Sequence, residues 1–183
     1  MCMRDLFLVV ALLAPLGLHA QPYGIGKPAS EHEIAGWNID VTPDGRGLPK
    51  GSGSVAQGKL VYDAQCASCH GPKGEGKPAD RLVGGKGTLA TGKPIRTIGS
   101  FWPYATTVYD YVYRAMPYNA PQSLTPDQVY AVTAYLLHMN GIVGADAVTD
   151  SSTLPKLQMP NRAGFTFDAR PDTANVPCRA DCR

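Results

Sequence analysis

Cys66-Ala67-Ser68-Cys69-His70 is the stretch that decides the fold of this chain. Two cysteines separated by two residues, with a histidine directly after the second, form the attachment signature of c-type haem. Each thiol adds to one vinyl group of the porphyrin, and the histidine then lies beneath the ring and offers an imidazole nitrogen to iron. The pattern therefore predicts one haem c, bound covalently by Cys66 and Cys69, with His70 as an axial ligand.

Three other interpretations of the two cysteines stay open at this point. Cys66 and Cys69 would form half of a zinc site if Cys178 and Cys182 completed it. They would be a thioredoxin-like redox pair in a βαβ setting, but no such pattern surrounds them. A plain structural disulfide is the third alternative. None of the three accounts for the position of His70.

The composition indicates one loop-rich domain. The chain has 183 residues, of which 20 are Gly and 16 are Pro, so much of it must be irregular. The formal net charge is +2, and basic and acidic residues are interspersed. This balance argues against nucleic-acid binding and gives no sign of a strongly charged partner.

Residues 1–20 have the pattern of an export signal. An apolar run from Leu6 to Leu18 follows Arg4, and Ala20 is a small residue at the expected cleavage point. The run is shorter than the roughly 20 apolar residues that a membrane span needs, so we expect no stable membrane span, with an uncut anchor as the alternative. Export to the periplasm agrees with c-type haem, which is attached outside the bacterial cytoplasm.

The first predicted helix covers residues 54–65 and leads directly into the attachment motif. Val55, Gly58 and Tyr62 share one of its faces. A glycine inside a helix is unfavourable by about 1 kcal/mol relative to alanine. We therefore expect Gly58 to permit a close crossing with another helix.

Two further helices are predicted after the haem-attachment region. One covers residues 105–115 and ends at Met116-Pro117, because proline does not continue a regular helix. The other begins after Thr125, which supplies an N-cap, with Gln128 completing a capping box. An apolar stripe follows, and Asn140-Gly141 ends the helix.

The segments between and around these helices are predicted to be irregular. Residues 21–53 form an arm with a short helical patch near 29–35, and we expect Trp37 to be buried as the arm packs over the core, with a partner-binding arm as the alternative. Residues 71–103 wrap the haem, and residues 143–183 form a surface tail. The apolar residues of 71–103 expected to face the haem are Leu82, Val83, Ile95, Ile98, Phe101 and Trp102.

A haem that only transfers electrons needs a second axial ligand. The candidates are Met116, Met139, Met159, His32 and His138. Met139 and His138 lie on a helix, where a methionine on an apolar stripe usually packs. Met116 ends a helix and follows the attachment motif by a long loop, so it is the preferred ligand. Methionine and histidine together fill both axial positions, which predicts an electron carrier with no open site on iron.

The attachment site, the Ala115-Met116-Pro117 turn and the three helices resemble class I cytochromes c. Longer stretches resemble the cytochrome c subunit of bacterial sulfite or sulfane dehydrogenases; they are residues 34–41 (IAGWNIDV), 51–55 (GSGSV), 101–107 (FWPYATT), 120–124 (APQSL), 129–135 (VYAVTAY) and 159–162 (MPNR). The resemblance implies an all-α fold, with a class I cytochrome c domain at 54–142 between long irregular extensions at 21–53 and 143–183.

The same resemblance implies a function and partners. The chain would be the haem subunit of a molybdenum enzyme that oxidises reduced sulfur, and it would pass electrons singly to a downstream cytochrome c. Catalysis would take place on the molybdenum subunit. In the tail, we expect Cys178 and Cys182 to be bonded to each other, which export permits.

One position departs from the family pattern. Class I cytochromes usually have a proline two residues before the leucine of the haem loop, and its carbonyl orients the proximal histidine. Here that position, before Leu82, is Asp80, whose backbone carbonyl remains available to hold His70.

Two other functions stay open from the sequence. One is a free-standing electron carrier for other oxidoreductases or a terminal oxidase. The other is a haem enzyme or gas sensor with an open iron position.

Overall fold

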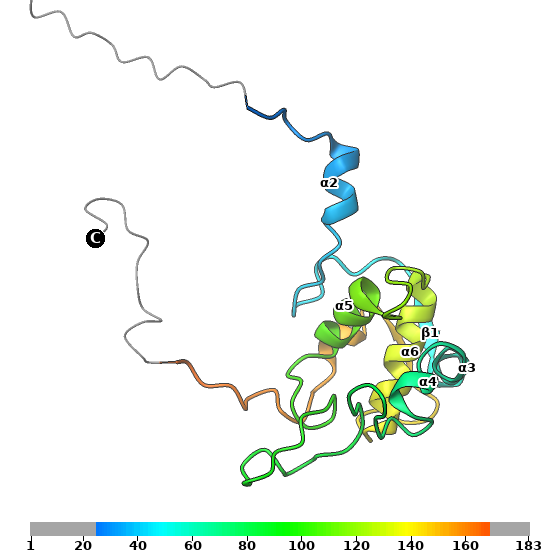
Figure 1. Ribbon diagram of the computed structural model, residues 1–183, viewed down its shortest axis with the longest axis vertical. Coiled ribbons are helices and arrows are strands. Elements are labelled where there is room, and N and C mark those ends of the chain that lie inside the picture. The colour runs from blue at the N-terminus through cyan, green and yellow to red at the C-terminus, as the bar shows by residue number, and fades with distance from the viewer. Residues whose placement is uncertain (1–24, 169–183) are drawn as a thin grey trace, which may run out of the picture. The chain divides into compact units, whose positions relative to one another are not determined.

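The computed structural model describes residues 25–168, which divide into a short first unit up to Gly36 and a larger second unit from Trp37 onwards (Figure 1). The predicted export signal at 1–20 lies outside the described residues, as do Cys178 and Cys182. Within the described part, no helix has the length and apolar character required to cross a bilayer.

Helix α2 (Glu31–Trp37) is the short helix expected in the N-terminal arm. The Ser30 hydroxyl accepts a hydrogen bond from the Glu33 N–H at 3.3 Å, and the Glu33 carboxylate accepts one from the Ser30 N–H at 2.8 Å. This capping box fixes the start of the helix. The expected burial of Trp37 is wrong, because α2 buries none of its residues and the indole is 87% exposed.

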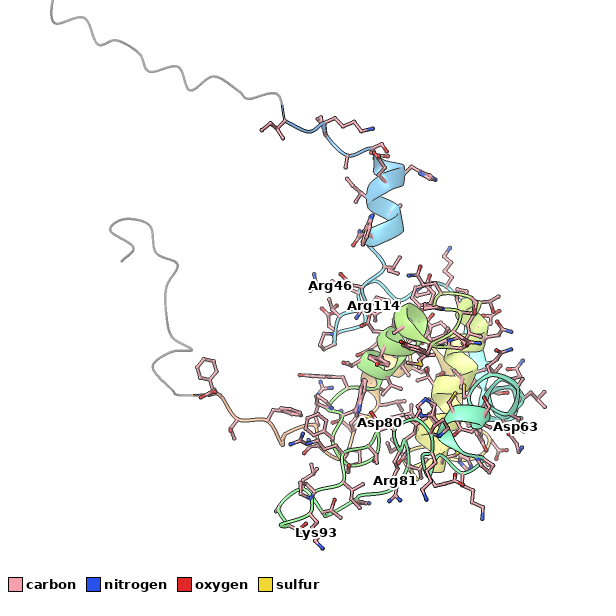
Figure 2. The ribbon with its side chains drawn as sticks, in the orientation of Figure 1. Arg46, Asp63, Asp80, Arg81, Lys93 and Arg114 are labelled. Atoms are coloured by element: carbon pink, nitrogen blue, oxygen red, sulfur yellow. The ribbon has the colours of Figure 1, made fainter. Side chains whose placement is uncertain are left out.

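The later part of the arm does pack on the core, beginning at Val41. Its side chain is buried, and its N–H donates to the Asp110 carboxylate at 2.8 Å. Arg114 lies at the last turn of α5 (Ala105–Ala115; Figure 2). It donates to the same carboxylate through Nη2 at 2.6 Å and Nε at 3.0 Å. The arm is thus tied to α5 through one largely buried acid.

Helix α6 (Pro126–Met139) is the centre of the second unit. It contacts α3 (Val55–Gln65), α5 and both strands, β1 (Ser52–Ser54) and β2 (Val148–Asp150). Thr125 and Gln128 form the predicted capping box, and Asn140 is the C-cap. The three main helices therefore begin and end within a residue of their predicted limits, and the mainly helical fold is confirmed.

The predicted close helix crossing lies where α3 meets α6. A Cβ atom on Gly58 would overlap the backbone carbonyl of Ala131, and it would come within 2.8 Å of the Tyr135 Cβ. Only glycine lets the two backbones approach so closely. Helix α3 then holds the short helix α4 (Ala67–His70), which carries the end of the attachment motif.

The tail differs from the expected irregular surface segment. Residues 148–150 form β2, which pairs antiparallel with β1 in the register Gly53↔Thr149. The 3-10 helix η1 (Leu154–Lys156) follows, and Leu154 and Met159 are buried in the core. Strands of three residues are too short to show an alternating apolar pattern, so nothing in the local sequence predicts their pairing.

Candidate haem-binding site

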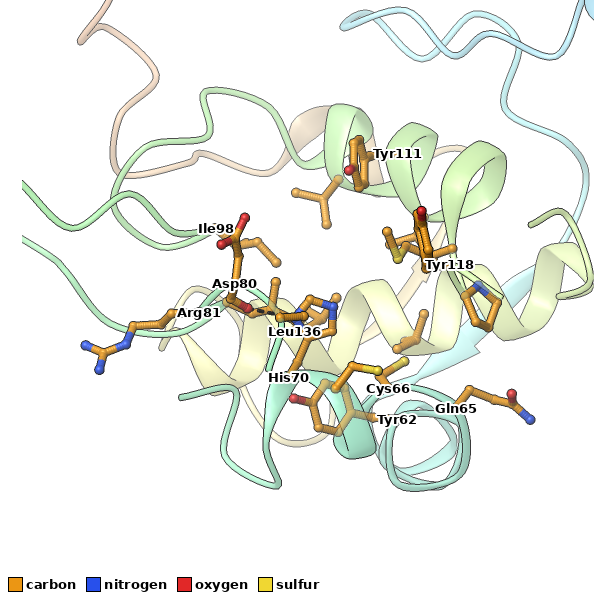
Figure 3. A pocket seen from close by; sticks show the side chains of 18 of the residues that line it. Tyr62, Gln65, Cys66, His70, Asp80, Arg81, Ile98, Tyr111, Tyr118 and Leu136 are labelled. Atoms are coloured by element: carbon orange, nitrogen blue, oxygen red, sulfur yellow. Dashed lines mark hydrogen bonds between the residues drawn. The ribbon is translucent and has the colours of Figure 1, made fainter. Parts of the chain in front are cut away.

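A cavity of about 630 Å³ lies between the helices and the loop that follows α4 (Figure 3). Cys66, Cys69, His70 and Met116 all line it, so the four predicted haem-binding residues are brought together in space. They come from three different places in the chain: the junction after α3, the helix α4 and the end of α5.

The two thiols are placed by the transition from α3 to α4. Cys66 is the C-cap of α3, and its N–H donates to the Tyr62 carbonyl at 2.9 Å. Its side chain is half-buried, whereas Cys69 is exposed. Burial, and secondarily the neighbouring Cys69, raises the pKa of Cys66 to about 11.

His70 is oriented by the loop that faces it. Its Nδ1 lies 2.7 Å from the backbone carbonyl of Asp80. A carbonyl only accepts hydrogen bonds, so Nδ1 carries the proton and Nε2 keeps a free lone pair. The loop is itself held to α4, because the Ala79 N–H donates to the Cys69 carbonyl at 2.9 Å. The backbone carbonyl of Asp80 thus orients the imidazole, as the sequence left it available to do.

Met116 is the one candidate sixth ligand among those considered that lines the cavity. Met159 is only 3% exposed and belongs to the core, and Met139 packs against that core. The Nδ1 of His138 is 3.1 Å from the Val143 carbonyl. The remaining candidate, His32, is an exposed residue of α2.

Half of the apolar residues predicted to face the haem line the cavity. Leu82, Ile98 and Trp102 line it. Val83 lies instead against Gly74, and the ring of Phe101 packs against that of Phe165 with centroids 5.3 Å apart. The sequence interpretation missed apolar residues contributed by helices and by the segment before α6; they are Val108, Val112, Leu124, Val132 and Leu136. Helical periodicity marked most of these positions as inward-facing but did not assign them to core or cavity.

Tyr62 closes the cavity beside the attachment motif (Figure 3). It is completely buried, and its hydroxyl donates to the Gly71 carbonyl at 2.7 Å. Burial raises the pKa of Tyr62 to about 12, so the phenol stays neutral in the physiological range. The polar end of the side chain is thereby satisfied while its ring presents an apolar surface to the cavity.

The chemistry of these residues fits a haem c. Two thiols at the attachment spacing lie next to an imidazole with a free Nε2, and a thioether and an apolar lining complete the cavity. The fold and this set of groups define a c-type cytochrome. The family model for cytochrome c matches residues 55–140, and together with the similar solved structure described next it shows that the chain belongs to the cytochrome c family.

A solved structure extends the likeness beyond that domain. The chain is similar to a chain in the crystal structure of the sulfane dehydrogenase SoxCD from Paracoccus pantotrophus, with 43% sequence identity and a TM-score of 0.77. The match covers 88% of this chain and 83% of that one. A comparison with curated protein sequences gave no significant match. The protein is thus a class I c-type cytochrome for electron transfer that resembles the SoxCD cytochrome chain.

Proposed function

We propose that this protein is an exported cytochrome with one haem c, and that it serves as the electron-transfer subunit of a molybdenum-dependent sulfite or sulfane dehydrogenase. The observation that carries the haem part is the convergence of Cys66, Cys69, His70 and Met116 on one cavity. The similarity to SoxCD supports the sulfur-oxidising partner. In this proposal the periplasm is the location, because residues 1–20 have the pattern of an export signal.

Each residue at the site has a defined task. Cys66 and Cys69 would hold the haem through thioether bonds, and His70 and Met116 would supply the side-chain ligands to its iron. Bound haem supplies one-electron redox chemistry. The Asp80 carbonyl keeps the imidazole of His70 in one tautomer and one orientation. The apolar walls exclude water, which is one of the factors that set the reduction potential of a haem.

The proposal also divides the chain by task. Residues 54–142 are the monohaem domain, the arm at 21–53 and the tail at 143–183 are extensions of it, and Cys178 and Cys182 are disulfide-bonded. Electrons arrive from the separate catalytic subunit and leave to a second cytochrome c. The chain itself has no catalytic residue in this scheme.

The haem site is tested by expressing the full chain with its export signal under conditions that permit haem attachment. We expect a red protein whose mass exceeds that of the polypeptide by one haem, and whose haem stays bound after denaturation. Absorption of the oxidised protein should include a methionine-to-iron band. Recovery of a colourless polypeptide with both thiols unmodified would reject the proposed function.

The sixth ligand is tested by Met116→Ala, with Met139→Ala as the matched control. The reduced parent protein and the control should not react with carbon monoxide, because both axial positions are filled. Met116→Ala should lose the methionine-to-iron band and bind carbon monoxide readily. Ready binding of carbon monoxide by the parent protein would instead indicate an open haem enzyme or sensor.

The partner is tested by mixing the purified cytochrome with the molybdenum subunit encoded by the same organism. Addition of sulfite or of protein-bound sulfane sulfur should reduce the haem. Co-purification of the two proteins from native extracts should accompany this activity. A red, methionine-ligated protein that neither co-purifies nor is reduced would be a free electron carrier, and the sulfur-oxidising part of the proposal would be wrong.

A further inference from the structure

One wall of the cavity comes from a loop at residues 100–104, immediately before α5. Trp102 lines the cavity, and its ring meets that of Tyr111 edge-on, with centroids 5.8 Å apart. Tyr111 lies on α5 and also lines the cavity. Trp102 is therefore held on one side by an aromatic contact, and its backbone belongs to a segment with no regular secondary structure.

Residues 159–165 of the tail, here called the strap, contact this loop on both sides of Trp102. The Asn161 side chain donates to the Phe101 carbonyl at 2.8 Å. The guanidinium carbon of Arg162 lies 4.1 Å from the centre of the Tyr104 ring. Phe165 adds an edge-on contact with the ring of Phe101. A side-chain hydrogen bond, a cation–π contact and an aromatic pair thus join strap and loop.

The strap has its own fixed geometry. Met159 is buried in the core and anchors one end, and its carbonyl accepts a hydrogen bond from the Arg162 N–H at 3.1 Å. The Gly164 N–H donates to the Asn161 carbonyl at 3.1 Å. A Cβ on Gly164 would overlap the side-chain amide of Asn161, so glycine is required for the amide to stay where it is. These contacts aim Asn161 and Arg162 at the loop.

We propose that Asn161 and Arg162 are positioning residues that hold Trp102 against the haem cavity, and that they thereby limit the access of water to the bound group. Asn161 binds the carbonyl of Phe101, one residue before Trp102. Arg162 covers the ring of Tyr104, two residues after Trp102. Holding the backbone at Phe101 and the side chain at Tyr104 restricts the indole between them. The strap lies outside residues 55–140, so the generic cytochrome c domain does not contain it.

This role has consequences that a purely stabilising contact would not have. The apolar shell around a metal centre controls solvent access and the local dielectric, and through them the reduction potential. A loosened loop lets water approach the haem and favours the oxidised, more highly charged state. The reduction potential should therefore fall when the strap is released. The indole should also spend more time away from the haem, which strongly quenches nearby tryptophan emission.

The experiment uses the full-length, haem-loaded protein carrying Trp37→Phe, which leaves Trp102 as its single tryptophan. Asn161→Ala combined with Arg162→Ala removes the two polar contacts, and Gly164→Ala displaces the Asn161 amide by a separate route. Arg46→Ala is the matched control, because Arg46 is exposed and its side chain pairs with Asp44. Tryptophan emission and the reduction potential are measured at a temperature where far-ultraviolet circular dichroism shows each variant to be folded.

The inference predicts a severalfold rise in Trp102 emission and a lower reduction potential in both strap variants, with neither change in Arg46→Ala. Unaltered emission and potential in the folded double variant would overturn it. If the double variant does not fold, Gly164→Ala alone decides between the same two outcomes, and Arg162→Lys, which keeps the positive charge, should give an intermediate change. The inference rests on the proposed haem site, but the two can fail separately. A red double variant with unaltered emission and potential rejects the role of the strap alone. A colourless parent protein rejects the haem site.

Discussion

Replacing Gly58 by alanine tests the packing that places the attachment motif. Gly58 lies on α3 where this helix crosses α6, and the added methyl group would meet the carbonyl of Ala131 and the Cβ of Tyr135. Both are fixed atoms of a helix that buries eight of its 14 residues, not the ends of flexible side chains. The clash is relieved only if the two helices move apart.

Two opposing terms give the expected magnitude. Alanine is favoured over glycine inside a helix by about 1 kcal/mol. Overpacking of a well-packed interior costs about 1 to 3 kcal/mol, and a clash with backbone belongs at the upper end of that range. We therefore expect Gly58→Ala to lower the free energy of unfolding by about 2 kcal/mol, and Tm by roughly 8 °C for a domain of this size.

Urea unfolding followed by far-ultraviolet circular dichroism measures this change. Gly144→Ala is the control, because Gly144 has no positive φ and an added Cβ would meet no atom within 4 Å, so the stability of this variant should stay close to that of the parent. Since α3 ends beside Cys66, the Gly58 variant should also attach haem less efficiently. A Gly58→Ala protein as stable as the parent would refute the close-crossing argument.

Four further substitutions test other parts of the structure. Asp110→Ala should lower the free energy of unfolding by about 2 kcal/mol, because it leaves the buried N–H of Val41 unpaired. Arg114→Ala should lower it by less than about 1 kcal/mol, because the Arg114 side chain is 43% exposed. Equal urea midpoints for the two variants would contradict this difference. Met159→Ala should cost about 3 kcal/mol in the same assay yet keep the methionine-to-iron band, and loss of the band would make Met159 the ligand. Hydrogen bonds, the largest from the Ser152 hydroxyl, lower the pKa of Asp150 from 3.8 to about 2, so the carboxylate stabilises the fold above pH 3.8 and this contribution is lost as the pH falls through about 2. The Tm difference between the parent and Asp150→Asn should therefore be constant near about pH 6 and shrink in acid, and a difference that grows in acid would refute the assignment.

The limits of the helices could be predicted because the signals that set them are local. Thr125 and Gln128 satisfy each other's backbone groups within one turn, and the proline after Met116 prevents α5 from continuing. The attachment motif is also local, since its spacing reflects the distance between two positions on one porphyrin. Gly58 could be interpreted only in part from the sequence. A glycine is unfavourable inside a helix, so it indicated a close helix crossing, but the sequence did not show which helix crosses α3.

Burial that depends on distant segments could not be predicted in this way. Trp37 has the residue type of a core position, but α2 buries none of its residues, and the core begins at Val41. The pairing of β1 with β2 joins segments nearly a hundred residues apart, and each strand is only three residues long. Their sequences contain no periodicity from which the sheet could have been inferred.

By itself, the sequence determined the chemistry of the site: two thiols and an imidazole at one spacing, a methionine at a helix end, and three helices with their caps. These features depend on neighbours in the chain. The sequence named Met116 and the Asp80 carbonyl as candidates, but only the tertiary structure could show that Met116 lines the cavity, that the Asp80 carbonyl lies beside His70, and that the strap packs against the loop of Trp102. Those contacts join residues whose closeness follows from how the helices pack, and packing is a property of the whole folded chain.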